Sequence, residues 1–275
     1  MMIDWDDALD NSGYIEGAAE FPARWTRSAA HARGELAGEC DIAYGSGPRE
    51  AFDLFRPAQT PQGLVVFVHG GYWHKFDRSY WSHLARGPLA AGWAVAILEY
   101  PLAPEVRIAG ITAAVGRGVE AAAGRVAGPM RLVGHSAGGH LVTRMICEDT
   151  PLGPDTLDRL ARVVSISGVH DLRPLLATTM NGTLRLTDAE AASESPALIA
   201  PLPGIPVSAW CGARERPEFL RQTRLLTEAW GWFGLGEGAT GIDALGTFED
   251  GENHFTVVDG LATPDSDLMH EVLRP

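Results

Sequence analysis

Residues 132–140 read LVGHSAGGH, and this stretch decides the fold. An apolar pair runs into Gly134, and Ser136 lies between small residues on both sides. Only glycine avoids a side-chain clash where a turn brings two backbones close together. The run GHSAG at 134–138 matches G-x-S-x-G, the pattern of a nucleophile elbow, in which a strained strand-to-helix turn exposes a serine. The stretch predicts either a nucleophilic Ser136 or an ordinary glycine-rich turn, and the rest of the chain has to decide between them.

Short apolar runs alternate with segments of helical composition on both sides of this stretch. Such alternation predicts βαβ units and an α/β fold, with a mainly parallel central sheet covered by helices on both faces. Residues 41–57 contain a GSGPRE turn between two apolar runs, which predicts an antiparallel hairpin leading into that sheet. The predicted parallel strands are 64–68, 93–98, 130–133, 162–167 and 206–211, and the predicted helices are 79–92, 110–126, 136–148 and 217–230.

No internal repeat or low-complexity linker divides the sequence, so we expect a single domain over residues 1–275. Residues 1–40 predict a helical N-terminal arm whose aromatic side chains pin it onto the body. Residues 173–203 break the strand–helix rhythm. An insertion at the carboxyl edge of a sheet often roofs a site, so we predict a small cap here; the alternative is a peripheral helical insertion without a role.

Composition and charge restrict the classes of partner. The 275 residues include 22 basic and 35 acidic ones, for a formal charge of −13, which repels phosphate backbones and anionic lipid. The three cysteines form no CxxC pair, and the acidic start MMIDWDDALD does not resemble a signal peptide. No stretch approaches the ~18–20 apolar residues of a membrane span. We therefore expect a cytoplasmic protein with a small-molecule acyl substrate, no nucleic-acid or membrane partner and no cofactor, and homodimerisation is left open.

The run FVHGGYWHKFD at 67–77 follows a predicted strand directly and supplies the second half of an acyl-transfer site. Hydrolysis of an acyl group passes through a tetrahedral oxyanion, which needs preorganised N–H donors. An HGG-type loop at this place in the chain is the expected partner of an elbow serine. We assign the oxyanion hole to the backbone N–H groups of Gly71, Tyr72 and Ala137. His69 has no metal-ligand spacing around it, so we predict that its ring holds the loop and that the site contains no metal.

A serine hydroxyl needs a base, and the base needs a third group to orient it. In this architecture the chain order is serine, acid, histidine. His254 lies in EDGENHF, a loop after the last strand-like run, and is our choice of base. Of the other histidines after Ser136, His140 lies on the elbow's own helix as a pocket or core residue, and His170 and His270 lie in a strand end and a helical segment.

The acid is expected in the loop after the penultimate strand, within WCGARERPEF at 210–219. Glu215 is the first carboxylate past that strand, and a glutamate with an unperturbed pKa of ~4.3 is ionised at neutral pH. Glu218 falls inside the helix that Pro217 opens. Asp171, after the preceding strand, is the rival, because some of these folds place their acid one strand earlier. Chain order favours Glu215.

Several of these segments together resemble kynurenine formamidase and its esterase-like relatives, which are α/β-hydrolases marked by an HGGxW motif. They are HGGYW (69–73), GHSAGG (134–139), SGVHDLRPLL (167–176), ERPEFLRQ (215–222) and NHF (253–255). The resemblance spans nearly the whole chain. It implies a metal-free Ser-acid-His hydrolase of small amides or esters, with Ser136 as nucleophile, His254 as base and the acid at Glu215. Many members have aspartate at that position, so this chain departs from the family in side-chain length.

Three functions remain open at this point. The first is formamidase activity on an aryl formamide such as N-formyl-kynurenine, the second is carboxylesterase or thioesterase activity on small acyl esters, and the third is a non-catalytic binding relative. An aromatic substrate would stack on an aromatic wall. We therefore assign Trp73 and His140 to substrate binding, with core packing as the alternative for Trp73.

Overall fold

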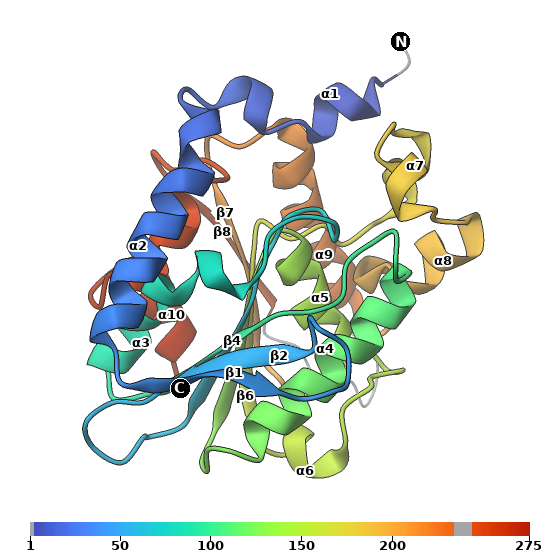
Figure 1. Cartoon of the computed structure of the whole chain (residues 1–275). Coiled ribbons are helices and arrows are strands. Elements are labelled where there is room, and N and C mark those ends of the chain that lie inside the picture. Colours follow the sequence, from blue (N-terminus) through green and yellow to red (C-terminus); the bar gives the residue numbers. More distant parts are fainter. Residues whose placement is uncertain (1–2, 234–243) are drawn as a thin grey trace.

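The computed structural model describes residues 3–233 and 244–275. Its centre is an eight-stranded sheet with the strand order β1-β2-β4-β3-β5-β6-β7-β8 (Figure 1). β1 and β2 form the expected antiparallel hairpin, β2 also pairs antiparallel with β4, and all the other pairs are parallel. The strands are β1 (Gly38–Ala43), β2 (Ala51–Phe55), β3 (Leu64–Val68), β4 (Ala94–Leu98), β5 (Met130–His135), β6 (Leu160–Ile166), β7 (Val207–Gly212) and β8 (Ala244–Glu249).

Helices cover both faces of the sheet, because its central strands are apolar on both faces. In β3, Leu64, Val66 and Val68 pack into one core, while Val65 and Phe67 pack into the other. The first face is covered by α4 (Ile108–Ala123), α5 (Ala137–Arg144) and α9 (Pro217–Phe233), and the second by α2 (Phe21–Glu35), α3 (Arg86–Ala90) and α10 (Asp267–Leu273) (Figure 1). The predicted α/β-hydrolase fold is confirmed.

The segment 79–92 differs from the predicted single helix. It consists of two short 3₁₀ turns, Arg78–Tyr80 and Ser82–Ala85, followed by the five-residue α3. Gly87 and Pro88 lie in the middle of this stretch, and proline lacks the N–H that a longer helix would need there. The resulting irregular segment places Trp81 in the core, where its side chain is 1% exposed.

The N-terminal arm contains α1 (Trp5–Leu9), two 3₁₀ turns (Ser12–Tyr14 and Ala18–Glu20) and α2. Phe21 and Trp25 bury their rings, as expected of residues that pin the arm, whereas Tyr14 stays exposed. Asp7 of α1 forms an ion pair with Arg216, whose guanidinium also lies over the Tyr14 ring. The arm is therefore fastened next to Glu215, beside the carboxyl ends of the parallel strands.

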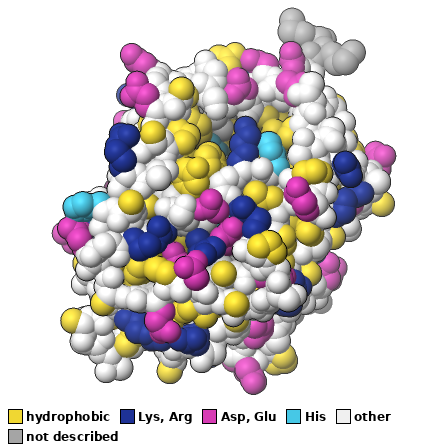
Figure 2. Space-filling model, in the orientation of Figure 1, with side chains coloured by type: hydrophobic (Ala, Val, Ile, Leu, Met, Phe, Trp, Pro, Cys, Tyr) yellow, Lys and Arg dark blue, Asp and Glu magenta, His cyan; other side chains and the backbone are white. Residues whose placement is uncertain are grey.

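The insertion at residues 173–203 folds into short elements next to α4 and α5. They are the 3₁₀ turns Arg173–Ala177 and Pro196–Leu198, with α7 (Asn181–Leu184) and α8 (Asp188–Ser193) between them. Outside the insertion, the remaining short helices of the described chain are α6 (Pro154–Leu157) and the 3₁₀ turn Val257–Ala262. On the face seen in Figure 2, basic and acidic side chains lie next to one another. None of the helices described is both long and apolar enough to cross a membrane.

Candidate active site

Ser136 lies in a sharp turn between β5 and α5, as the elbow motif predicts. Its backbone has φ 56° and ψ −118°, a strained conformation for a residue with a side chain. The Ser136 N–H donates to the Ile166 carbonyl of the neighbouring strand at 2.8 Å, which helps to hold this conformation. The turn places the hydroxyl at the carboxyl end of the central parallel strands.

The glycine of the elbow at position 138 is required by a close backbone approach. A Cβ at Gly138 would lie 1.9 Å from the Val68 carbonyl oxygen at the end of β3. α5 can therefore start directly against the strand that leads into the HGG loop. This contact brings the two motifs recognised in the sequence to the same edge of the sheet.

Ser136, His254 and Glu215 form a continuous hydrogen-bonded chain. His254 Nε2 lies 3.1 Å from Ser136 Oγ, and His254 Nδ1 lies 2.6 Å from Glu215 Oε2. A carboxylate can only accept, so Nδ1 carries the proton and Nε2 is free to accept the serine proton. The His254 and Glu215 side chains are 4% and 0% exposed, which shields the pair from competing water.

The Glu215 carboxylate is held by several donors. Ser167 Oγ donates to Oε1 at 2.5 Å and the Gly212 N–H donates to the same oxygen at 2.9 Å, which leaves Oε2 for His254. Burial disfavours ionisation, but the neighbouring His254 and these donors together hold the pKa of Glu215 below its ordinary value. Glu215 is thus an ionised, fixed acceptor for the imidazole N–H.

Asp171, the rival acid, is occupied elsewhere. Both of its carboxylate oxygens accept from Arg173, at 2.9 and 3.0 Å. His170 is buried against Thr143 and Ser165, and His270 of α10 is exposed. The structure thus brings Ser136, Glu215 and His254 together, and leaves Asp171 and the other candidate histidines outside this chain of hydrogen bonds.

The HGG loop lies against Ser136. Gly71 has φ 111° and Tyr72 has φ 49°, and the Gly71 carbonyl accepts from the N–H of Lys75 at 2.9 Å, which closes a tight turn. Within the described chain, the backbone N–H groups of Gly71, Tyr72 and Ala137 have no hydrogen-bond partner. His69 Nδ1 lies 2.7 Å from the Gly70 carbonyl oxygen and its ring stacks on Tyr100, so His69 holds the loop as expected.

We expect Gly70→Ala to lower kcat at least tenfold. The added methyl group would lie 2.8 Å from Ser136 Cβ and 2.9 Å from the His135 carbonyl oxygen, so either the loop or the serine has to move, and such displacements are costly for catalysis. Gly182→Ala in α7 is the matched control, because a Cβ there meets nothing within 4 Å. Steady-state kinetics of both variants on one ester test this. Equal kcat values for the two variants would contradict the placement of the loop.

Trp73 and His140, the predicted substrate-binding residues, lie in the core instead. Both are 0% exposed, and Trp73 Nε1 donates to His140 Nδ1 at 3.2 Å. Because Nδ1 accepts this bond, Nε2 carries the proton and donates to the Glu194 carbonyl at 2.7 Å. Burial lowers the pKa of His140 to about 3, consistent with a neutral ring. Their large apolar surfaces pack beneath the loop, and we do not include them in the substrate site.

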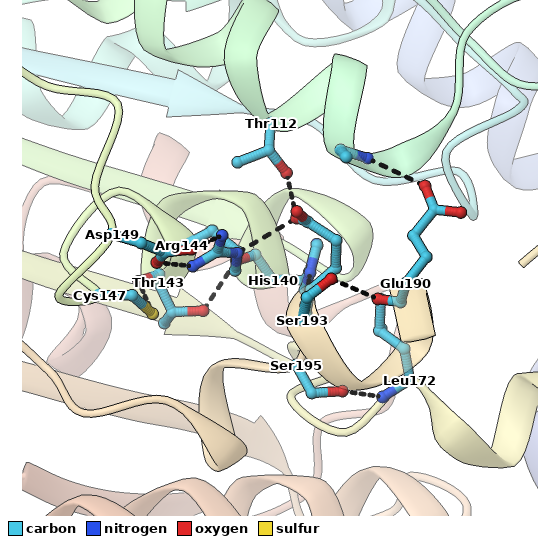
Figure 3. A network of polar contacts seen from close by, with 12 residues as sticks. Thr112, His140, Thr143, Arg144, Cys147, Asp149, Leu172, Glu190, Ser193 and Ser195 are labelled. Carbon is cyan, nitrogen blue, oxygen red and sulfur yellow. Dashed lines mark hydrogen bonds and ion pairs between the residues drawn. The ribbon is translucent and has the colours of Figure 1, made fainter. Parts of the chain in front are cut away.

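Figure 3 shows the network to which His140 belongs. Glu194 Oε2 accepts from Thr112 Oγ1 of α4 at 2.7 Å and from Arg144 Nε of α5 at 3.1 Å. Arg144 also forms a two-pronged ion pair with Asp149, at 2.7 and 2.9 Å. These buried contacts fasten residue 194, at the end of α8, to the helix that begins after Ser136. Through Trp73, the same network reaches the HGG loop.

No family model matches the chain. Among curated proteins, it is similar to kynurenine formamidase of Salmo salar, with 27% identity over 88% of this chain and 83% of that protein. Among solved structures, it is similar to a protein of Silicibacter sp. TM1040 described as a "putative thioesterase", with 45% identity, a TM-score of 0.92, and coverage of 98% of this chain and 99% of the other. An esterase of Pyrobaculum calidifontis shares the fold, with 18% identity, a TM-score of 0.66, and coverage of 96% and 90%.

The chain belongs to the formamidase-like α/β-hydrolases. Its fold, the nearly full-length alignment with the Silicibacter protein and the similarity to kynurenine formamidases agree with the resemblance read from the motifs. This hydrolase acts on small substrates, and its relatives are named for different ones.

The sequence did not indicate which residues line the cavity beside Ser136. This cavity encloses about 90 Å³, and an aromatic wall of Trp25, Phe76, Trp81 and Phe255 forms much of its lining. The other lining residues are Asn11, Ser12, Gly70, Gly71, Tyr72, Lys75, His135, Ser136 and His254. Among the residues described, none from the 173–203 insertion lines this cavity, whereas the N-terminal arm contributes to it.

The sequence patterns also did not identify two residues that support Glu215 and His254. Ser167, which donates to Glu215, has no motif of its own, although it begins the SGVHD segment. His135 Nε2 lies 2.9 Å from the His254 carbonyl oxygen and donates to it, so the residue before Ser136 also positions the loop that carries His254. Burial lowers the pKa of His135 to about 3, so its ring is neutral. His135 occupies the first x position of G-x-S-x-G, and its place next to Ser136 in this motif could have pointed to its role.

Proposed function

We propose that this hydrolase is a serine hydrolase that cleaves small amides or esters by two-step acyl transfer. The observation that carries the proposal is the hydrogen-bonded chain Glu215–His254–Ser136, with contacts of 2.6 and 3.1 Å, next to three unpaired backbone N–H groups. Such a constellation is recognised by its geometry and by the role of each group.

In the first step, Ser136 Oγ attacks the carbonyl carbon of the substrate, and His254 Nε2 takes the hydroxyl proton. The new C–O bond converts the carbonyl oxygen into an oxyanion, to which the N–H groups of Gly71, Tyr72 and Ala137 donate. Glu215 stabilises the imidazolium that forms. His254 then gives its proton to the leaving amine or alcohol as the bond to the carbonyl carbon breaks, and an acyl-Ser136 remains.

In the second step, water attacks the acyl-enzyme. His254 Nε2 takes a proton from this water, and the same donors stabilise the second oxyanion. Collapse of the tetrahedral intermediate returns the proton to Ser136 Oγ and releases the acid. Each oxyanion donor in such a site is worth about 10²–10³ in kcat.

The substrate we propose first is an aryl formamide, with N-formyl-kynurenine as the representative, converted to kynurenine and formate. The support is the aromatic wall of the cavity beside Ser136, on which the ring of an aryl formamide would stack. The Silicibacter protein's description favours a second candidate, hydrolysis of a small thioester or carboxylic ester by the same machinery.

Parallel kinetics on N-formyl-kynurenine, p-nitrophenyl acetate and an acetyl thioester decide between these substrates. For the first candidate we expect kcat/KM on the aryl formamide to exceed that on the two esters after correction for their intrinsic reactivity. A preference for the thioester would support the second candidate. Absence of turnover on all three, with no labelling of Ser136 by a phosphonate, would contradict the proposed function.

Catalysis should not require a metal ion, because the nucleophile, the base and the oxyanion donors are all supplied by the chain. We expect full activity after prolonged dialysis against EDTA, measured as kcat/KM on p-nitrophenyl acetate. The control is the same preparation dialysed without chelator and then supplied with zinc or manganese. Activity that EDTA removes and a metal restores would reject the serine mechanism as written.

A further inference from the structure

Lys75 stands out at the catalytic cavity for its charge. It is the only lysine in the sequence, and it is the only Lys, Arg, Asp or Glu residue that lines the cavity in the described part of the chain. Most arginines of the described chain form ion pairs, for example Arg78 with Asp53 at 3.1 Å. Lys75 has no such partner among the residues described. In a chain of formal charge −13, a lysine that has no ion pair within the described residues therefore lines this cavity.

Asn11 supplies a second unmatched donor to the same cavity. Its side chain is 4% exposed, and its Nδ2, which carries two N–H donors, is buried. A buried amide without an acceptor is costly, and such groups in native proteins call for an explanation. The Tyr72 phenol oxygen accepts from one N–H of the Asn11 amide, while its own proton goes to the Leu9 carbonyl. A substrate acceptor would satisfy the second N–H of the Asn11 amide.

Lys75 belongs to a short turn that Asn11 also contacts. Lys75 closes the 71–75 turn through its backbone N–H, and Asn11 contacts Tyr72 within that turn. The acidic neighbours on the arm are held by other groups: Asp7 by Arg216, and Asp10 by the Gly13 N–H at 3.1 Å. Lys75 is exposed, so it lies where the cavity opens to solvent.

We propose that Lys75 and Asn11 form an anion subsite at the cavity mouth, which selects substrates whose leaving group carries a carboxylate. The inference rests on the proposed function, because it takes Ser136 as the point of attack. The aromatic wall takes the ring of an aryl leaving group, and the carboxylate of that group accepts from the Lys75 ammonium and the Asn11 amide. Lys75 acts in specificity and takes no part in the bond-breaking steps.

The test compares 3-acetoxybenzoate with its neutral methyl ester, which share the acyl group and the phenolic leaving oxygen. We expect the protein to prefer the anion by about fivefold to tenfold in kcat/KM, the range for a partly exposed charge-assisted contact. Lys75→Met should bring this ratio close to one, and Lys75→Glu should reverse it. High salt should reduce the ratio of the unmodified protein, because it screens an exposed charge.

Arg185→Met is the matched control, since it removes one positive charge from an exposed residue outside the cavity. It should leave the ratio at the value of the unmodified protein. Asn11→Asp should push the ratio below one by placing a carboxylate against that of the substrate, and Asn11→Leu should lower it by removing the donor. Phosphonate labelling of Ser136 in every variant verifies that the acylation site is intact.

A ratio near one in the unmodified protein, a ratio unchanged in Lys75→Met, or an equal fall in Arg185→Met would overturn the anion subsite. With Ser136 labelled normally, these results would leave the proposed serine mechanism standing. Failure of the phosphonate to label Ser136 in the unmodified protein would instead contradict the proposed function, and the subsite with it.

Discussion

Ser136→Ala should reduce kcat on the order of 10⁶-fold, the largest effect expected of any substitution in this chain. The variant lacks the oxygen that forms the acyl-enzyme, so only binding and oxyanion stabilisation remain. Alanine tolerates the backbone conformation at φ 56° about as well as serine does, so we expect the fold to survive. Steady-state kinetics and far-UV circular dichroism on the same preparation measure the two quantities.

A serine-directed phosphonate gives an independent readout. Mass spectrometry should show one adduct on the unmodified protein, located at Ser136, and none on Ser136→Ala. Ser193→Ala, at an exposed serine of α8, is the matched control and should be labelled and active like the unmodified protein. An adduct at another serine, or unchanged activity in Ser136→Ala, would require a different nucleophile.

The second large effect concerns the acid. Glu215→Gln should keep the fold and lower kcat on the order of 10⁴-fold. Ser167 and Gly212 both donate to one carboxylate oxygen, so the carbonyl oxygen of glutamine would occupy that place. Its NH₂ group would then face His254 Nδ1 and donate to it, which leaves the imidazole proton on Nε2. That tautomer cannot accept the Ser136 proton.

Two companion variants sharpen this result. Glu215→Asp keeps the charge but shortens the reach by one methylene, so it cannot keep the contacts to both Gly212 and His254, and we expect an intermediate kcat. Asp171→Asn should change kcat only a few-fold, because it loses an ion pair with an exposed arginine. A large loss of kcat in Asp171→Asn, together with a nearly normal kcat in Glu215→Gln, would instead assign the acid to Asp171, after the preceding strand.

The N-terminal arm is a better target for engineering this hydrolase than the 173–203 insertion. The arm places Asn11, Ser12 and Trp25 on the cavity, while the insertion is fastened to α4 and α5 by the buried Glu194 contacts. We therefore expect substitutions in the arm to change which substrates the cavity accepts. Substitutions around Glu194 are expected to act through the position of the helix that follows Ser136.

The sequence by itself determined the parts of the protein that depend on short-range geometry. Apolar runs of strand length between helical segments specify a doubly covered parallel sheet, because both faces of such strands have to be buried. The GHSAG and HGG runs specify two turns through the steric freedom of their glycines. Chain order was enough to choose His254, and to favour Glu215 over Asp171, as the partners whose hydrogen bonds the structure shows.

Only the tertiary structure decided which side chains meet across long stretches of chain. Local patterns place Asp171 and Glu215 in neighbouring loops, but which carboxylate reaches His254 depends on the path of each loop and on donors such as Ser167. Trp73 and His140 follow their motifs directly, yet their side chains turn into the core, where they pair with each other. The arm reaches the cavity from more than a hundred residues before Ser136, and only packing of Phe21 and Trp25 against the body brings Asn11 there. Such contacts arise from burial of apolar surface between distant segments, for which a local sequence pattern carries no signal.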